Sequence, residues 1–105
     1  MKTTAPNGAG LIGLTAILAM LSGAAVAYSG QQYAHQAKVS IEQARQIALK
    51  SHPGRITDEE LEREGGGSGL RYSFDIKNGS ATQEVGVDAM TGRVLENKRE
   101  GKNPD

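Results

Sequence analysis

Apolar and polar residues alternate most regularly in the second half of the chain. Leu70, Tyr72, Phe74 and Ile76 are apolar, and a polar or charged residue stands between each neighbouring pair. Period-two alternation is typical of a β-strand with one buried face. The sequence therefore predicts a strand that begins at Leu70 and buries these four side chains.

The dipeptide Asn78-Gly79 ends this alternation and predicts a tight hairpin turn, because both residues tolerate positive φ angles. Placing Lys77 opposite Ser80 puts apolar residues of the next strand on the same face, whereas a slip by one residue would bury polar ones. The other pairs expected in this register are Ile76 with Ala81, Phe74 with Gln83, Tyr72 with Val85, and Leu70 with Val87.

A helix is predicted upstream of the strand. Its apolar stripe consists of residues at helical spacing, namely Ile41, Ala44, Ile47 and Ala48. Ser40 and Gln43 form a capping-box pattern before the stripe, and Pro53-Gly54 ends the helix near Ser51. Since so short a helix is marginal alone, we expect its stripe to pack on the apolar face of the strands.

Residues 55–64 are ambiguous. Helix propensity and a second capping-box pattern, Thr57 with Glu60, favour a helix. A strand would have to bury Ile56 and Leu61, whose odd spacing requires a β-bulge. From local propensity alone the helix is the stronger prediction.

Asp88 stands before a four-residue connection that leads into a last short strand with Val94 pointing inward. An Asp in this position accepts backbone N–H groups in an Asx-turn, and Gly92 takes a left-handed angle that closes the loop. A catalytic or metal-binding role would need a second carboxylate, and the candidates are Glu84 and Asp75 on the outward face. We expect Asp88 to form the turn.

The N-terminal part differs from the rest. An uncharged apolar run, residues 11–27, follows Lys2 and ends in Ala25-Val26-Ala27, which is typical of a signal peptide cleaved before Tyr28. An uncleaved membrane anchor is the alternative. Residues 28–37 are polar and without period, so they are predicted to be a flexible tether, and residues 101–105 a disordered tail.

Composition excludes several classes of function. Twelve Lys and Arg balance twelve Asp and Glu, so there is no electrostatic case for binding nucleic acid. Cysteine is absent, and His35 and His52 do not form a ligand pair, so neither a metal nor a cofactor is expected. The serines lie in no nucleophile motif, and residues 65–69 are no phosphate loop. We therefore expect no catalytic residues.

Taken in order, "VSIEQARQIALKSHPGRITDEELERE", "LRYSFDIKNG" and "QEVGVDAMTGRVLE" resemble the PepSY domain over about residues 38–98, and the domain is predicted to span residues 38–100. The family has an Ile-x-x-x-x-Ala helix, a Pro-Gly exit, a strand ending in Leu-Glu, and a Val-Asp-Ala-x-Thr-Gly hairpin. The resemblance implies an α+β fold, one amphipathic helix on a three- to four-stranded antiparallel sheet. It also implies that residues 55–64 are a strand.

The resemblance further implies a small exported, periplasmic or secreted module without enzymatic activity, which inhibits or regulates peptidases by binding them. The expected partner is a peptidase or another envelope protein, with the membrane met only through the signal peptide. An envelope module that senses a ligand or a cation is the alternative. The residues expected to contact a partner are the outward-facing Arg71, Ser73, Asp75 and Glu84, with Arg71 diagonal to Glu84 as a weak ion pair.

Overall fold

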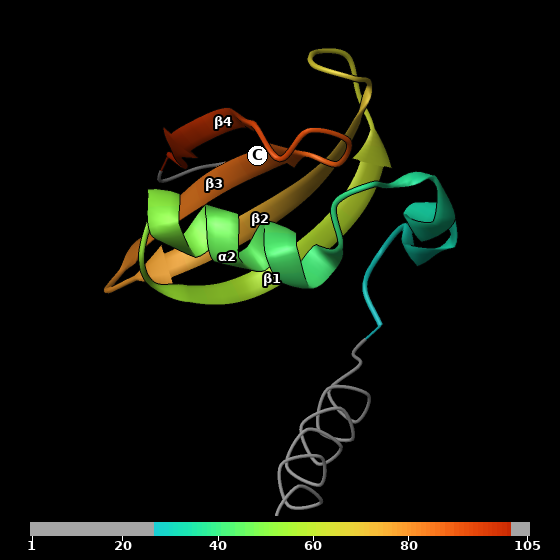
Figure 1. Ribbon diagram of the computed structural model, residues 1–105. Helices are drawn as coiled ribbons and strands as arrows, with labels where there is room; N and C mark the ends of the chain where they lie inside the picture. Colours follow the sequence, from blue (N-terminus) through green and yellow to red (C-terminus); the bar gives the residue numbers. More distant parts are fainter. Residues whose placement is uncertain (1–26, 102–105) are drawn as a thin grey trace, which may run out of the picture.

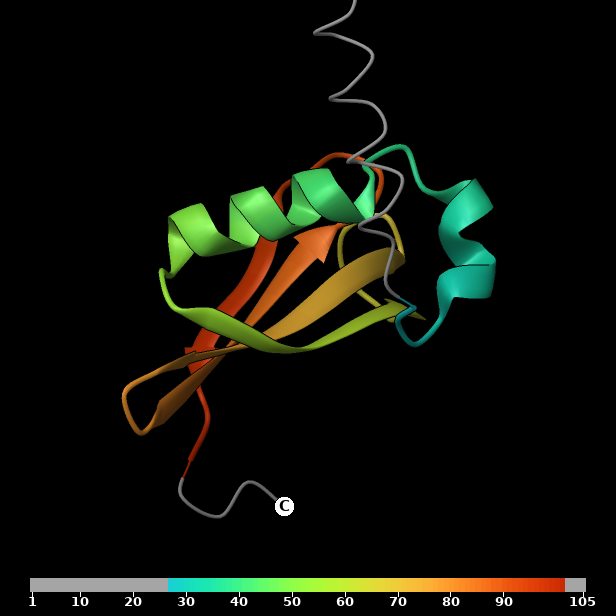
Figure 2. The same ribbon diagram turned by 90° about the horizontal axis from the view of Figure 1, so that it is seen from below.

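The computed structural model of the chain describes residues 27–101. The predicted signal peptide and tail lie outside this range, apart from one residue of each. Four strands form one antiparallel sheet in the order β1-β2-β3-β4, and the helix α2 lies across one face of it (Figures 1 and 2). This is the α+β fold that the resemblance to the PepSY domain implies. The elements are η1 (Gln31–Gln36), α2 (Ile41–Ser51), β1 (Arg55–Arg63), β2 (Leu70–Asn78), β3 (Ala81–Asp88) and β4 (Val94–Arg99).

Helix α2 begins and ends where its capping signals predict. The backbone N–H of Gln43 donates to Ser40 Oγ at 3.1 Å, and Ser40 N–H donates to Gln43 Oε1 at 2.9 Å, which completes the capping box. His52 is the C-cap, and its N–H donates to Ala48 O at 2.9 Å. Neither helix in residues 27–101 is long and apolar enough to span a membrane.

Residues 55–63 form strand β1, so the prediction from the resemblance is confirmed and the prediction from propensity is wrong. The bulge that a strand requires is present, because the pairing with β2 shifts between Ile56 and Asp58. The bulge brings both Ile56 and Leu61 to the face that α2 covers, where Leu61 is fully buried. Tertiary packing therefore overrides the local helix propensity.

The turn between β2 and β3 lies one residue further along than predicted. Asn78 is opposite Ala81, so Gly79 and Ser80 form the turn. Gly79 has φ 68° and supplies the positive angle that the first position of a two-residue hairpin turn needs. Asn78 stays in β2, and its side-chain amide donates to Pro53 O at 3.0 Å.

The strand register therefore differs from the prediction by two residues. Phe74 lies opposite Val85, and Tyr72 lies opposite Val87. A shift of two leaves every side chain on its predicted face. Both valines now face aromatic rings, which packs larger apolar surfaces together than the predicted pairs do.

The core lies between α2 and the sheet, and all four residues that the alternation predicts are in it. Phe74 and Ile76 are fully buried, and Tyr72 and Leu70 are 1% and 4% exposed. Burying a side chain of this size contributes about 1.5–3 kcal/mol. The other members of the core come from α2, from β1, from β3 and from the turn after it: Ile41, Ala44, Ala48, Leu61, Val85, Val87 and Ala89.

Val94 was predicted to point inward, but the structure does not enclose it. It lies opposite the buried Val87, but it is 36% exposed and is an exposed large hydrophobic residue. Strand β4 is an edge of the sheet, and its pairing with β3 shifts between Gly86 and Val87. Val94 is therefore neither a core residue nor one of the partly buried apolar residues that pack against the core.

Residues 28–37, predicted as a tether, have a definite conformation, and we call them the strap. The strap contains η1 and lies beside β1 (Figure 1). Ser29 pairs in parallel with Glu60, and Leu61 N–H donates to Ser29 O at 2.8 Å. The ring of Tyr28 lies 6.4 Å from that of Tyr72, centroid to centroid. These contacts are tertiary, so no periodic pattern in the strap could reveal them.

Candidate functional site

The sheet face opposite α2, which we call the outer face, carries the four residues predicted to contact a partner. Figure 2 shows α2 on one side of the sheet and none of the described elements covering the other. Ser73, Asp75 and Glu84 are half-buried there, and Ser73 Oγ donates to Glu62 Oε2 at 2.8 Å. The structure thus gathers three of the four predicted residues on one accessible surface.

Asp75 and Glu84 lie directly opposite each other in neighbouring strands. Burial raises the pKa of Asp75, and the nearby carboxylates of Glu100 and Asp58 raise it further. Burial also raises the pKa of Glu84, with Glu96 and Asp75 adding to the effect. Like charges directly opposite each other destabilise a sheet, so this pair is held together by the fold rather than by attraction.

Arg71 is buried rather than exposed, so the predicted pair with Glu84 is wrong. Only 7% of Arg71 is exposed, and its guanidinium donates to Glu96 Oε1 at 3.2 Å and to Gly65 O at 3.1 Å. The register puts Asp75, not Arg71, beside Glu84. Nε of Arg71 has no hydrogen-bond partner among the described residues. Arg71 therefore ties β2 to β4 and to the loop after β1.

Asp88 is a buried hydrogen-bond acceptor, and only 2% of it is exposed. Its carboxylate accepts the N–H and the hydroxyl of Ser68 at 2.7 and 2.8 Å, Met90 N–H at 2.8 Å and Thr91 N–H at 3.2 Å. Burial by itself raises the pKa of Asp88, but these hydrogen bonds outweigh it and hold the pKa below its usual value.

These contacts place Asp88 in the turn that the sequence predicts. Gly92 has φ 83°, and its N–H donates to Asp88 O at 2.9 Å to close the connection to β4. The sequence does not reveal the second role of Asp88, which is to hold the loop of residues 65–69. At Gly67 in that loop, a Cβ atom would lie 2.3 Å from Asp88 Oδ2, so only glycine permits the approach.

No three His, Cys, Asp or Glu side chains in residues 27–101 are placed to hold a metal ion together. His35 is exposed in η1, where its Nδ1 lies 3.0 Å from Gln32 O. His52 is the C-cap of α2. The two histidines therefore lie on different elements, and neither joins Asp75 and Glu84 in a group of three candidate metal ligands within residues 27–101.

The strap creates two grooves that the sequence does not predict. One of about 380 Å³ lies between the strap and the first turn of α2, and its lining includes Tyr28, Tyr72 and Arg45. The other, of about 300 Å³, lies beside the free edge of β1. The one signal in the sequence of the strap is its two aromatic residues, Tyr28 and Tyr33, because aromatic side chains favour packing against a protein surface over exposure to water.

The residue pattern and the fold agree with one family of protein modules. Residues 38–98 match the PepSY family, described as peptidase propeptide and YPEB domain. The match covers more than half of the chain, and the chain belongs to this family. No curated protein and no solved structure matches the chain.

Proposed function

We propose that this chain is an exported, non-enzymatic PepSY module that regulates a peptidase by binding it. The observation that carries the proposal is the family match over residues 38–98, because the family is described by its place in peptidase propeptides. PepSY domains occur in exported or envelope proteins. The apolar run over residues 11–27 is consistent with such a location.

Binding uses the outer face, because the inner face is filled by α2. Asp75 and Glu84 present two carboxylates there that form no ion pair within residues 27–101, and burial, together with the neighbouring carboxylates, raises their pKa values. A basic patch on the peptidase would relieve this repulsion on binding. The mechanism is steric, since a bound module covers part of the enzyme that substrate must reach.

The proposed module has no catalytic activity of its own. Asp88 is the most buried carboxylate of the turn region, and its oxygens are already engaged by Ser68, Met90 and Thr91. A general base needs a free oxygen within reach of the proton that it abstracts. The geometry therefore supports a structural role for Asp88.

Sensing of a cation or another ligand is the alternative. Asp75 and Glu84 supply two carboxylates, but hard cations such as Ca²⁺ take six to eight oxygen ligands. Within residues 27–101 no group of three candidate ligands converges. No observation on the described residues favours this alternative, and calorimetric titration with calcium, zinc and copper would reveal it.

The proposal is tested by titrating thermolysin-like metallopeptidases with the purified full chain and measuring residual activity. We expect saturable inhibition and a complex that survives size-exclusion chromatography. The chain carrying Phe74→Ala, which should not fold, is the control for inhibition by an unfolded competitor substrate. Full activity and no complex at high micromolar concentrations of the chain would contradict the proposal.

A further inference from the structure

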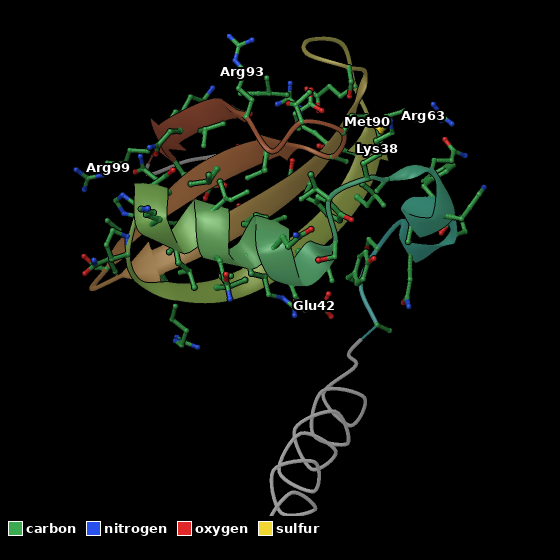
Figure 3. All side chains as sticks on the ribbon, in the orientation of Figure 1. Lys38, Glu42, Arg63, Met90, Arg93 and Arg99 are labelled. Carbon is green, nitrogen blue, oxygen red and sulfur yellow. The ribbon has the colours of Figure 1, made fainter. Side chains whose placement is uncertain are left out.

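Strand β4 is the edge of the sheet that lies away from the strap. Glu100 N–H donates to Thr82 O at 2.9 Å, so it points toward β3. Alternate residues of a strand direct their backbone groups to the same side, so the N–H and C=O groups of Asn97 and Arg99 point away from β3. Within residues 27–101 these groups form no hydrogen bond. Both residues are exposed, and Figure 3 shows Arg99 projecting away from the sheet.

The pairing of β4 with β3 is regular where the edge is exposed. Its one irregularity is at the start of β4, between the pairs that Gly86 and Val87 of β3 form, and the pairs from Glu96 to Arg99 follow in unbroken register. Proteins protect edge strands with bulges and with lysines. Here the bulge leaves most of the strand regular, so the charges of β4 decide which strand can pair with it.

These charges are Glu96 and Lys98, which flank Asn97. Both lie on the outer face, since they pair with Gly86 and Glu84, which are alternate residues of β3. Lys98 Nζ is 3.7 Å from Glu96 Oε2, which is longer than a hydrogen bond, and the side chain of Lys98 is 69% exposed. The ammonium group of Lys98 is therefore accessible to a carboxylate of another chain.

The pattern is complementary to itself. In a two-fold symmetric pair, residue i of one copy faces residue j of the other and the reverse also holds. An antiparallel register centred on Asn97 puts outward backbone groups opposite one another and places Glu96 opposite Lys98 twice. A register centred one residue earlier or later also aligns the outward groups. It would put Glu96 opposite Glu96 or Lys98 opposite Lys98, however, and like charges directly opposite each other are destabilising.

We propose that a second copy of this chain pairs with β4, antiparallel and centred on Asn97, so that the two sheets become one. The two Asn97 residues exchange main-chain N–H···O=C hydrogen bonds, and Glu96 and Lys98 form two equivalent ion pairs across the two-fold axis. The inference goes beyond the proposed function, because it concerns association of the chain with itself rather than with a peptidase.

This pairing leaves the outer face accessible. The two-fold axis of an antiparallel strand pair is perpendicular to the sheet, so both outer faces lie on the same side of the dimer. The β3 strands of the two copies are three strand spacings apart, roughly 14 Å. The dimer therefore presents Asp75 and Glu84 of both copies on one surface, and a partner with two basic patches would bind both copies at once.

The test follows the ¹⁵N-labelled full chain from low micromolar to millimolar concentration by sedimentation and by amide exchange. One pair of edge strands buries a small area, so we expect a weak dimer that forms toward the higher concentrations. As it forms, the amides of Asn97 and Arg99 should shift and exchange more slowly, and that of Gly79 in the distant turn should not change.

Two results would overturn the proposal directly. One is a chain that stays monomeric at millimolar concentration. The other is protection of the Asn97 and Arg99 amides that does not depend on concentration, because a segment of the same chain would then cover the edge.

Two variants test the register. Asn97→Pro removes an outward N–H and should abolish association, since proline is tolerated in an edge strand where its nitrogen faces solvent. Lys98→Glu places two glutamates opposite each other at both ion pairs and should weaken association about tenfold. The matched control is Lys77→Glu, the same charge reversal at an exposed position of β2, which should associate like wild type.

The Phe74 amide, at a fully buried residue of the core, reports whether each variant is folded. If Asn97→Pro is unfolded, Lys98→Glu decides, because the side chain that it replaces is 69% exposed. Association that is unchanged in the folded β4 variants, as association through the apolar run of residues 11–27 would be, would contradict the inference. No peptidase is present in any arm, so a failure here is distinguishable from a failure of the proposed function.

Discussion

The two faces of the sheet use the same strands for different purposes. On the inner face, Tyr72, Phe74 and Ile76 are enclosed by α2 and are at most 1% exposed. On the outer face, Asp75 lies between Phe74 and Ile76 in the sequence, and Glu84 lies opposite Asp75 in the neighbouring strand. Both carboxylates are half-buried, and their like charges are adjacent. The inner face contains the buried apolar residues that stabilise the fold, whereas the outer face retains unfavourable charge, which the proposed partner would relieve.

The outer face also contains two contrasting carboxylate environments. Asp88, at one end of β3, is held by hydrogen bonds that lower its pKa. Asp75 and Glu84, further along, have raised pKa values because burial and neighbouring carboxylates disfavour their charged forms. Asp88 is buried and stabilises the fold, whereas Asp75 and Glu84 are the acidic residues that the proposed partner could reach.

The largest expected effect is on the inner face. Phe74→Ala removes a fully buried ring and should destabilise the protein by about 3–5 kcal/mol. A domain of this size without disulfides is stabilised by roughly 3–5 kcal/mol, so the variant should be largely unfolded by circular dichroism at 25 °C. Lys77→Ala, an exposed change on the same strand, should alter the free energy of unfolding by less than about 0.5 kcal/mol. A folded Phe74→Ala variant would contradict the comparison.

The next largest effect is at Asp88. Asp88→Asn removes the charge that several N–H and O–H groups stabilise, and should lower the free energy of unfolding by about 1.5–3 kcal/mol at neutral pH. Because the folded-state pKa lies below the usual 3.8, this stabilisation is present above pH 3.8 and is lost as pH falls through the folded-state pKa. Urea titrations from pH 7 downward measure the difference between wild type and variant.

The control for Asp88 is Asp58→Asn, which removes an exposed carboxylate on the neighbouring surface. It should not reproduce the loss of stability. Hydrogen exchange adds a local readout, since the Ser68 amide donates to Asp88 at 2.7 Å and should lose protection in Asp88→Asn. An Asp88→Asn variant as stable as wild type at neutral pH would mean that the loop is held by other contacts.

Asp75→Asn should have the smallest effect and the opposite sign. The raised pKa means that wild type loses stability as pH rises from 3.8 through the folded-state pKa, and the variant does not. The variant should therefore be more stable at pH 7 by about 0.2–1 kcal/mol, and the gain should vanish below pH 3.8. Chemical denaturation at both pH values checks this, and a variant less stable than wild type at pH 7 would refute it.

Elements whose signals are local could be predicted from the sequence. The bounds of α2 follow from Ser40, Gln43 and Pro53, and the inner face of β2 follows from its alternation. The register of the β2–β3 hairpin could not be predicted from Asn78-Gly79 alone, because the pairing also depends on how the β3 valines pack against the aromatic rings. The identity of β1 required the family resemblance.

Features that depend on distant contacts escaped prediction. Asp88 was expected in a turn, but its bonds to Ser68 join residues 20 positions apart in the chain. Arg71 has an outward position in β2, yet the loop of residues 65–69 and Glu96 bury it. The strap has no period, and its docking on β1 is visible only in three dimensions.

One measurement tests most directly the claim that the outer face is the functional one. Asp75→Lys places a cation opposite Glu84, which should preserve the sheet while removing the negative patch. The matched control is Glu42→Lys, the same charge change at an exposed position of α2, on the other side of the sheet (Figure 3). In inhibition titrations of a thermolysin-like metallopeptidase, we predict that Asp75→Lys weakens inhibition about tenfold and that Glu42→Lys inhibits like wild type. Equal inhibition by wild type and Asp75→Lys, or a loss in Glu42→Lys alone, would contradict the account.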